Sequence, residues 1–202
     1  MSLSAASKLH RLLGRFSGYY WLVVTQALYR PAFGAIGRRS RILQPLKLRN
    51  MENIFIGQRV TIARHTWLLT SPALLDRTPK LVIGDGCQLG HFNHITCVDS
   101  VVLGSKVLTA DRVHISDNSH AFENPDIPIM DQPVVSKGPV SIGSGSWLGE
   151  NVNVLSCSIG RNCVIGANAV VTKDIPDFCV AVGIPARIIR RFDKESRTWK
   201  TV

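Results

Sequence analysis

Aliphatic residues recur every sixth position along most of the chain, and a glycine often follows them directly. An amphipathic helix would repeat every 3.6 residues and an ordinary strand every two, so neither explains the spacing. A period of six predicts a parallel β-helix, in which short strands stack coil upon coil. The recurring positions are Ile36, Ile42, Leu48, Ile56, Ile62, Leu68, Ile83, Leu89, Ile95, Leu103, Thr109, Ile115, Ile142, Leu148, Val154, Ile159, Ile165 and Val171.

A second pattern has the same phase. The position four residues after the aliphatic one is mostly small or β-branched, so each flat strand would place one aliphatic and one compact residue inside a narrow prism. These compact residues are Ser40, Val60, Thr66, Cys87, Val107, Val113, Ser146, Val152, Cys163 and Ala169. Asn93 also occupies this position. Glycine suits the corners, where a side chain would be costly.

Three six-residue repeats make one triangular coil of about 18 residues. Six coils are expected, beginning at Ile36, Ile56, Ile83, Leu103, Ile142 and Ile159. The phase slips by two extra residues within 97–100 and by one missing residue between Val154 and Ile159. Longer insertions occupy residues 70–80 and 117–139, and such insertions form corner loops that often carry function.

The domain organisation follows from this repeat. We expect a helical arm at 1–34, an all-β parallel β-helix at 35–182 and a short basic helical tail at 183–202. The chain has 202 residues and a net charge of +10. Nine Lys/Arg precede the first acidic residue, Glu52. No recognition helix or zinc-finger spacing accompanies this charge, so nucleic-acid binding is not expected.

Within the arm, residues 19–29 form an apolar, aromatic-rich run that is too short to span a bilayer as a helix. Two interpretations stay open. The helix could lie on an anionic membrane as a peripheral contact, or it could cap the first coil or pack on a neighbouring subunit, because a solenoid needs its ends covered. No small-residue cleavage site follows the run, so we expect no signal peptide.

The five cysteines are odd in number and form no CxxC pair. A reduced, cytoplasmic protein with structural thiols is therefore expected. The chain contains neither a Walker A motif nor GxGxxG, so nucleoside triphosphates and NAD are not indicated.

Several sequence motifs carry a family resemblance. Residues 138–191 contain Ser-Ile-Gly-Ser-Gly-Ser-Trp-Leu-Gly, Val-Val-Thr-Lys-Asp-Ile-Pro and Val-Gly-Ile-Pro-Ala-Arg. This series resembles the hexapeptide-repeat acetyltransferases, including galactoside and maltose acetyltransferases. The motif Ile-Ser-Asp-Asn-Ser-His at 115–120 and the Asp-Gln-Pro segment after it resemble the acetyltransferases of capsule, colanic-acid and O-antigen synthesis. The resemblance implies a left-handed β-helix, acetyl-CoA as co-substrate and a homotrimer with active sites between subunits.

Transfer of an acyl group from a thioester to a hydroxyl needs a base with a near-neutral pKa. His120 is the only histidine of the long loop and matches the family's general base. By the same resemblance, Asn93 is a second catalytic candidate that would contact the acceptor and the tetrahedral centre. Its compact inward position also allows a purely structural role.

The resemblance assigns the remaining site residues. Trp147 precedes an inward leucine, so it should point outward as a platform for a sugar ring or a subunit contact. Asp117, at the start of the loop, is the other expected substrate-binding residue. The coenzyme A positions are Gly149, Ala167, Thr172, Lys173 and Arg187. The basic tail would lie near the cofactor's phosphates.

The expected function is acetyl-CoA-dependent O-acetylation of a saccharide or lipid-linked saccharide in surface-polysaccharide synthesis. Acetylation of an antibiotic or small amine, and a non-catalytic scaffold, stay open as alternatives. A zinc carbonic anhydrase would need three suitably spaced histidines. His114 and His120 are six apart, which fits poorly, so no metal is expected. Cys157 stands where the family has a longer Leu-Pro-Gly segment, and we do not expect it to be a nucleophile, because the family transfers the acyl group directly.

Overall fold

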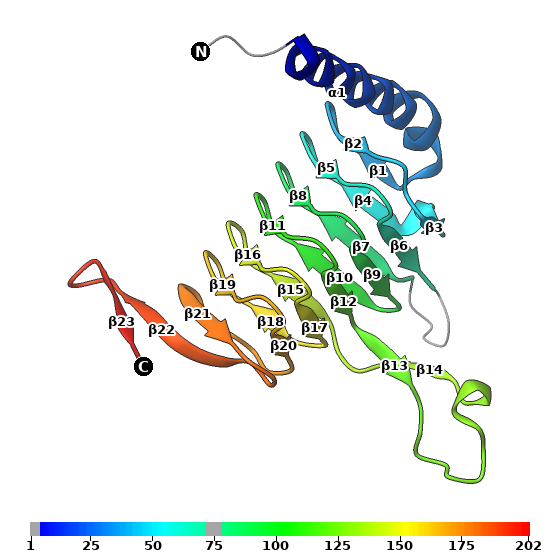
Figure 1. The fold of residues 1–202 in the computed structure, drawn as a ribbon. Coiled ribbons are helices and arrows are strands. Elements are labelled where there is room, and N and C mark those ends of the chain that lie inside the picture. The colour runs from blue at the N-terminus through cyan, green and yellow to red at the C-terminus, as the bar shows by residue number, and fades with distance from the viewer. Residues whose placement is uncertain (1–4, 72–77) are drawn as a thin grey trace.

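The computed structural model describes residues 5–71 and 78–202, so residues 72–77 of the expected 70–80 insertion lie outside the described residues. Three stacks of short parallel strands form the body of the protein (Figure 1). We call these stacks the first, second and third faces, in the order in which the chain visits them.

Each coil contributes one strand to each face. The first face contains β1 (Ala35–Ile36), β4 (Ile54–Ile56), β7 (Lys80–Ile83), β10 (Ser100–Leu103), β15 (Val140–Ile142) and β18 (Ser158–Ile159). The second face contains β2 (Arg41–Ile42), β5 (Thr61–Ile62), β8 (Gln88–Leu89), β11 (Leu108–Thr109), β16 (Trp147–Leu148), β19 (Val164–Ile165) and β21 (Cys179–Val182), and it continues into β22 (Arg187–Asp193) and β23 (Thr198–Thr201). The third face contains β3 (Lys47–Arg49), β6 (Trp67–Thr70), β9 (His94–Cys97), β12 (His114–Ser116), β17 (Asn153–Leu155) and β20 (Val170–Val171).

The strand register confirms the six coils expected from the sequence. On the first face, Ile36 pairs with Ile56, Ile56 with Ile83 and Ile83 with Leu103, and the same register continues to Ile159. Because every coil places its aliphatic residue directly over the previous one, the core is a continuous column of buried apolar side chains.

The compact positions are also buried as expected, and the polar ones are satisfied within the wall. Ser146, for example, donates from Oγ to the carbonyl of Gly160 at 2.8 Å and accepts the N–H of Cys163 at 3.0 Å. Corner glycines are required by close stacking. A Cβ on Gly143 would lie 2.5 Å from backbone atoms of the next coil, so the coils could not approach each other as they do.

The N-terminal arm is helical and covers the open first coil. It comprises α1 (Ala5–Val24), a π-helical turn (Thr25–Tyr29) and a 3-10 turn (Arg30–Ala32). Buried Thr25 accepts the N–H of Ile42 at 2.9 Å, and Gln26 donates to the carbonyls of Gly37 and Ser40. These bonds satisfy first-coil groups that no preceding coil can reach. In the described part of the chain, no helix combines the length and apolar character needed to cross a membrane.

The C-terminal segment corrects a sequence-based expectation, because it is an antiparallel hairpin and not a helix. β22 pairs with β21, and β23 pairs with β22 (Figure 1). The ring of Phe192 packs near those of Phe178 and Trp199, at centroid distances of 6.4 and 5.6 Å. The open edge of the last coil needs a hydrogen-bonding partner, and a strand supplies one where a helix would not.

The 117–139 insertion projects away from the body of the β-helix (Figure 1). It begins and ends as a two-stranded antiparallel hairpin of β13 (Asn118–His120) and β14 (Val134–Ser136), with a 3-10 turn (Ile129–Asp131) between them. A second 3-10 turn, Met51–Asn53, precedes β4.

Candidate functional site

His120 is the last residue of β13, and its side chain is exposed. It pairs with Val134 in the antiparallel register, and the next residue, Ala121, donates its N–H to the Pro133 carbonyl at 2.8 Å. The imidazole is therefore presented to solvent from a hydrogen-bonded hairpin. That placement suits a general base, which must reach a bound acceptor.

Gln132 organises the loop beyond His120. Its side chain is buried, and its amide donates to the carbonyls of Asn124 and Ile127 at 2.8 Å each. Its Oε1 accepts the N–H of Asn124. Sequence reasoning missed this residue, because nothing in the local pattern distinguishes a buried loop glutamine from an exposed one.

Asp117 is fully buried, and its carboxylate accepts hydrogen bonds from three consecutive backbone N–H groups. These belong to Val98, Asp99 and Ser100, at distances of 2.8 to 3.1 Å. The two extra residues of the phase slip are therefore held by the residue that starts the long loop. This geometry gives Asp117 a positioning role and does not favour the direct substrate contact expected from the sequence.

Asn93 is almost completely buried inside the β-helix. Its Nδ2 donates to Thr109 Oγ1, and its Oδ1 accepts the N–H of Val113 at 2.7 Å. An amide enclosed in this way favours the structural role over the direct acceptor contact expected from the resemblance. The compact inward position predicts what is observed, a side chain that joins neighbouring coils.

Trp147 points outward from the second face, as its place in the repeat predicts. Its neighbours in the register are Leu108 and Val164, and the Leu108 side chain is also exposed. Together they form an apolar surface where a sugar ring or another subunit could pack.

Lys173 and Arg187 come together at the C-terminal end of the β-helix. Both line a hollow of about 330 Å³ with Asp174, Ile175, Ala186 and Ile188. Asp174 accepts the N–H of Ser158 at 2.7 Å. Within the described residues neither cation makes an ion pair. The hollow therefore presents positive charge that could bind a phosphate.

The other expected cofactor positions are divided between two corners. Gly149 and exposed Ala167 lie at the corner between the second and third faces, whereas exposed Thr172 lies beside Lys173. A Cβ on Gly149 would lie 2.7 Å from the Ala167 nitrogen, so coil stacking already requires glycine there.

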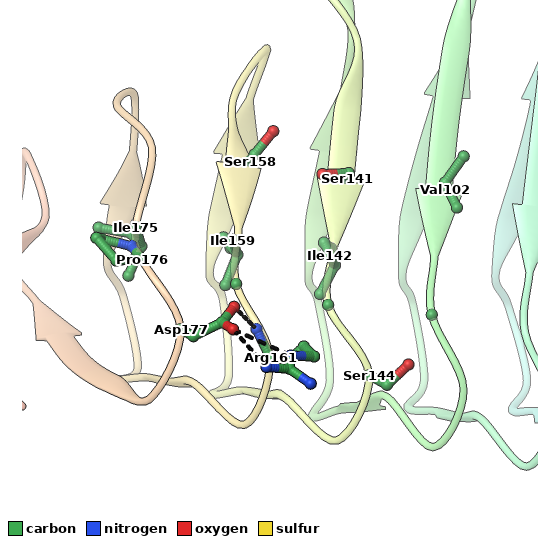
Figure 2. Close-up of a pocket in the computed structure, with 13 residues that line it drawn as sticks. Val102, Ser141, Ile142, Ser144, Ser158, Ile159, Arg161, Ile175, Pro176 and Asp177 are labelled. Atoms are coloured by element: carbon green, nitrogen blue, oxygen red, sulfur yellow. Dashed lines mark hydrogen bonds and ion pairs between the residues drawn. The ribbon is translucent and has the colours of Figure 1, made fainter. Parts of the chain in front are cut away.

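A larger groove of about 520 Å³ follows the first face across its last coils (Figure 2). Ser141 and Ser158 pair in register, and because they are small, they leave the surface hollow. Arg161 and Asp177 form an ion pair of 3.0 Å at one side (Figure 2). Sequence reasoning missed this groove, although small residues at successive outward positions were a usable signal.

A row of outward side chains in register crosses the third face, comprising Lys47, Trp67, His94, His114 and Asn153. The ring centroids of Trp67 and His94 are 4.5 Å apart, and those of His94 and His114 are 5.3 Å apart. In residues 5–71 and 78–202, no group of three His, Cys, Asp or Glu side chains is placed to hold a metal ion.

The five cysteines are free and buried. Burial raises the pKa of Cys97 to about 12 and that of Cys157 to about 11. A thiol with so high a pKa is protonated near neutral pH and is a poor nucleophile. Cys157, which stands where the family has a longer Leu-Pro-Gly segment, is therefore not favoured as a nucleophile.

A β-helix of six-residue repeats, interrupted by a projecting loop with an exposed histidine, defines the hexapeptide-repeat transferase class. A family profile described as "Bacterial transferase hexapeptide (six repeats)" matches residues 139–173. The chain is 34% identical to the putative lipopolysaccharide biosynthesis O-acetyl transferase WbbJ of Escherichia coli, over 81% of this chain and 85% of that protein. It is 30% identical to the galactoside O-acetyltransferase of E. coli, over 76% of this chain and 74% of that protein. The chain belongs to the hexapeptide-repeat acetyltransferase family.

One further relative is matched over less of its length, and solved structures share the fold. The probable acetyltransferase Rv3034c of Mycobacterium tuberculosis is 37% identical over 68% of this chain, which spans only 42% of that protein. Among solved structures, the Bacillus cereus N-acyltransferase AntD, in complex with dTDP and 3-hydroxybutyryl-CoA, has a TM-score of 0.70 at 19% identity, covering 85% of this chain and 90% of that one. A maltose O-acetyltransferase from Clostridium difficile has a TM-score of 0.51 at 23% identity, covering 89% and 84%. These likenesses establish the shared fold.

Proposed function

We propose that this protein transfers an acetyl group from acetyl-CoA to a hydroxyl of a saccharide or lipid-linked saccharide in surface-polysaccharide synthesis. His120 takes the hydroxyl proton as the oxygen attacks the thioester carbon. The C–O bond forms, the C–S bond breaks, and the coenzyme A thiolate leaves and takes up a proton. No acyl-enzyme is needed, and the buried thiols are consistent with direct transfer.

The observation that carries the proposal is the exposed His120 on a hydrogen-bonded hairpin, in a chain whose relatives are O-acetyltransferases. A non-catalytic scaffold would have no need to hold a titratable side chain in this way. Lys173 and Arg187 supply a cationic hollow for cofactor phosphates, and the solved AntD complex with an acyl-CoA supports a coenzyme A site on this fold. Trp147 is the proposed platform for the acceptor sugar. We place the enzyme in the cytoplasm, where acetyl-CoA and reduced cysteines are found.

The proposed assembly is a homotrimer of left-handed β-helices. β13, which ends at His120, lies to the side of the body, whereas β22, which begins at Arg187, lies at its C-terminal end (Figure 1). Lys173 lines the same hollow as Arg187. The loop also exposes Phe122, Ile129 and Met130 to solvent. A neighbouring subunit would cover these apolar side chains, and it would also bring its own cofactor hollow near His120.

The test is a transfer screen with acetyl-CoA against monosaccharides, nucleotide sugars, lipid-linked oligosaccharides and amino sugars, with release of the free thiol as readout. We expect turnover with a hydroxyl acceptor and a loss of roughly 100-fold or more in His120→Ala. His91→Ala changes another exposed histidine and should retain activity. Near-normal turnover in His120→Ala would contradict the role of His120 as the general base. Transfer to amines alone would show that the enzyme is an N-acetyltransferase and not an O-acetyltransferase.

A further inference from the structure

The arm presents an apolar stripe to solvent along one side of α1. Phe16, Tyr19, Tyr20 and Val23 are 64%, 68%, 59% and 47% exposed. Spacings of three and four residues place them on one helix face. Leu28 in the following turn is also exposed.

The other side of the arm, in α1 and in the π-helical turn that follows it, already has a partner. Thr25 and Gln26 bond to the first coil, and the Arg41 guanidinium lies near Gly18, 3.3 Å from the position that a Cβ would occupy there. Capping therefore accounts for one side of the arm and leaves the aromatic stripe uncovered. Large exposed apolar patches with polar surroundings mark interaction surfaces.

Arginines gather where the arm meets the body. Arg38, Arg39 and Arg59, which we call the arginine corner, line a hollow of about 290 Å³ with Gln58. The Gln26 amide joins this corner to the helix, because it donates to the two carbonyls that bracket Arg38 and Arg39. The nearby Asp85 carboxylate accepts the Gln58 N–H at 2.8 Å, and residues 1–51 contain no acidic side chain.

We propose that the arm lies on an anionic lipid surface, with its aromatic stripe in the headgroup region and the arginine corner on lipid phosphates. Tyrosine and phenylalanine beside cations are typical of helices that lie in the membrane interface. A second copy of the chain is a poorer partner, because it would bring nine further Lys/Arg from residues 1–51 against the same charge. The proposal does not depend on which acceptor the enzyme uses.

The test is sedimentation of the full-length protein with vesicles of phosphatidylcholine alone or with phosphatidylglycerol added. One variant carries Arg38→Gln, Arg39→Gln and Arg59→Gln. Its matched control carries Arg190→Gln, Arg191→Gln and Arg197→Gln, which removes the same charge from the exposed C-terminal hairpin. A third variant, Phe16→Ser with Tyr19→Ser and Tyr20→Ser, removes the stripe.

Wild type should bind phosphatidylglycerol vesicles and not phosphatidylcholine alone, and added salt should weaken binding. Each arginine removed should lower the affinity for these vesicles about fivefold, so the corner variant should bind on the order of 100-fold more weakly. Its control should bind as wild type does. The stripe variant should also lose binding, and both the stripe variant and the corner variant should retain transfer to a soluble acceptor.

Equal losses in the corner variant and its control would overturn the proposal, because only net charge would then matter. So would unchanged binding by the stripe variant. A stripe variant that instead forms a smaller oligomer, measured by light scattering, would assign the stripe to contacts between copies. None of these outcomes bears on the His120 mechanism, which the soluble-acceptor assay tests separately.

Discussion

Two half-buried histidines lie side by side on the outer surface of the third face. Burial lowers the pKa of His94, and the neighbouring His114 and Lys47 lower it further. Burial also lowers the pKa of His114, although a hydrogen bond with Asn153 opposes this effect. Each imidazole therefore takes up a proton less readily in the folded protein than in the unfolded chain.

The pH dependence of stability follows from the direction of these shifts. Below about pH 6.5 the unfolded chain binds more protons than the folded one at these two positions, so the free energy of unfolding decreases as the pH falls. We expect the urea midpoint to fall between pH 7.5 and 5.5 in wild type. The His94→Gln/His114→Gln variant should flatten that dependence. His91→Gln, at an exposed histidine, is the control and should keep the wild-type slope; an equally steep slope in the double variant would contradict the argument.

At the scale of elements, the projecting loop and the β-helix are stabilised by different means. Stacked aliphatic residues hold the coils, whereas the loop depends on its hairpin and on the buried amide of Gln132. Loss of that amide leaves two carbonyls and one N–H without their partner, which costs more than a solvent-exposed bond would. The consequence should be confined to the loop that carries His120.

Gln132→Ala is therefore expected to reduce turnover by roughly 10-fold, less than His120→Ala, because the base is misplaced and not removed. Thermal unfolding of the β-helix should stay close to wild type, and proteolysis within residues 121–133 should become faster. Gln88→Ala, at an exposed glutamine of β8, should leave turnover, thermal unfolding and the rate of proteolysis unchanged. A large decrease in melting temperature in Gln132→Ala would show that the loop belongs to the main cooperative unit.

For the whole molecule, the question is whether His120 and the cationic hollow of Lys173 and Arg187 act together within one subunit or across two subunits. If each active site combines His120 of one subunit with the hollow of the next, two inactive variants should complement each other. We expect His120→Ala and a Lys173→Ala/Arg187→Ala variant to regain activity when co-expressed, with about a quarter of the sites intact. Purified variants mixed without subunit exchange should stay inactive. Co-expressed protein with no more activity than the two separate variants would place the whole site within one subunit.

The features of this protein that could be predicted from the sequence are those that follow its six-residue repeat. The six-residue repeat predicted the coils, the inward residues and the outward direction of Trp147, because a stacked solenoid repeats the same environment at the same phase. The position of Asn93 in that repeat likewise pointed to its buried role, against the catalytic role suggested by the resemblance. The loop position of His120 was readable as well, because an insertion in a regular wall must project from it.

Only the tertiary structure decided the features that depend on partners distant in sequence. The C-terminal segment is a hairpin because the open edge of β21 needs hydrogen bonds, and the tail's basic composition does not report that need. Asp117 is buried because three backbone N–H groups of the preceding coil surround its carboxylate. The fold of the backbone brings Lys173 and Arg187 to one hollow, and it places Gln26 where it bonds to the carbonyls on either side of Arg38 and Arg39. No local sequence pattern predicts either arrangement. Periodicity thus determines the wall of this protein, whereas contacts between distant segments decide what is presented on it.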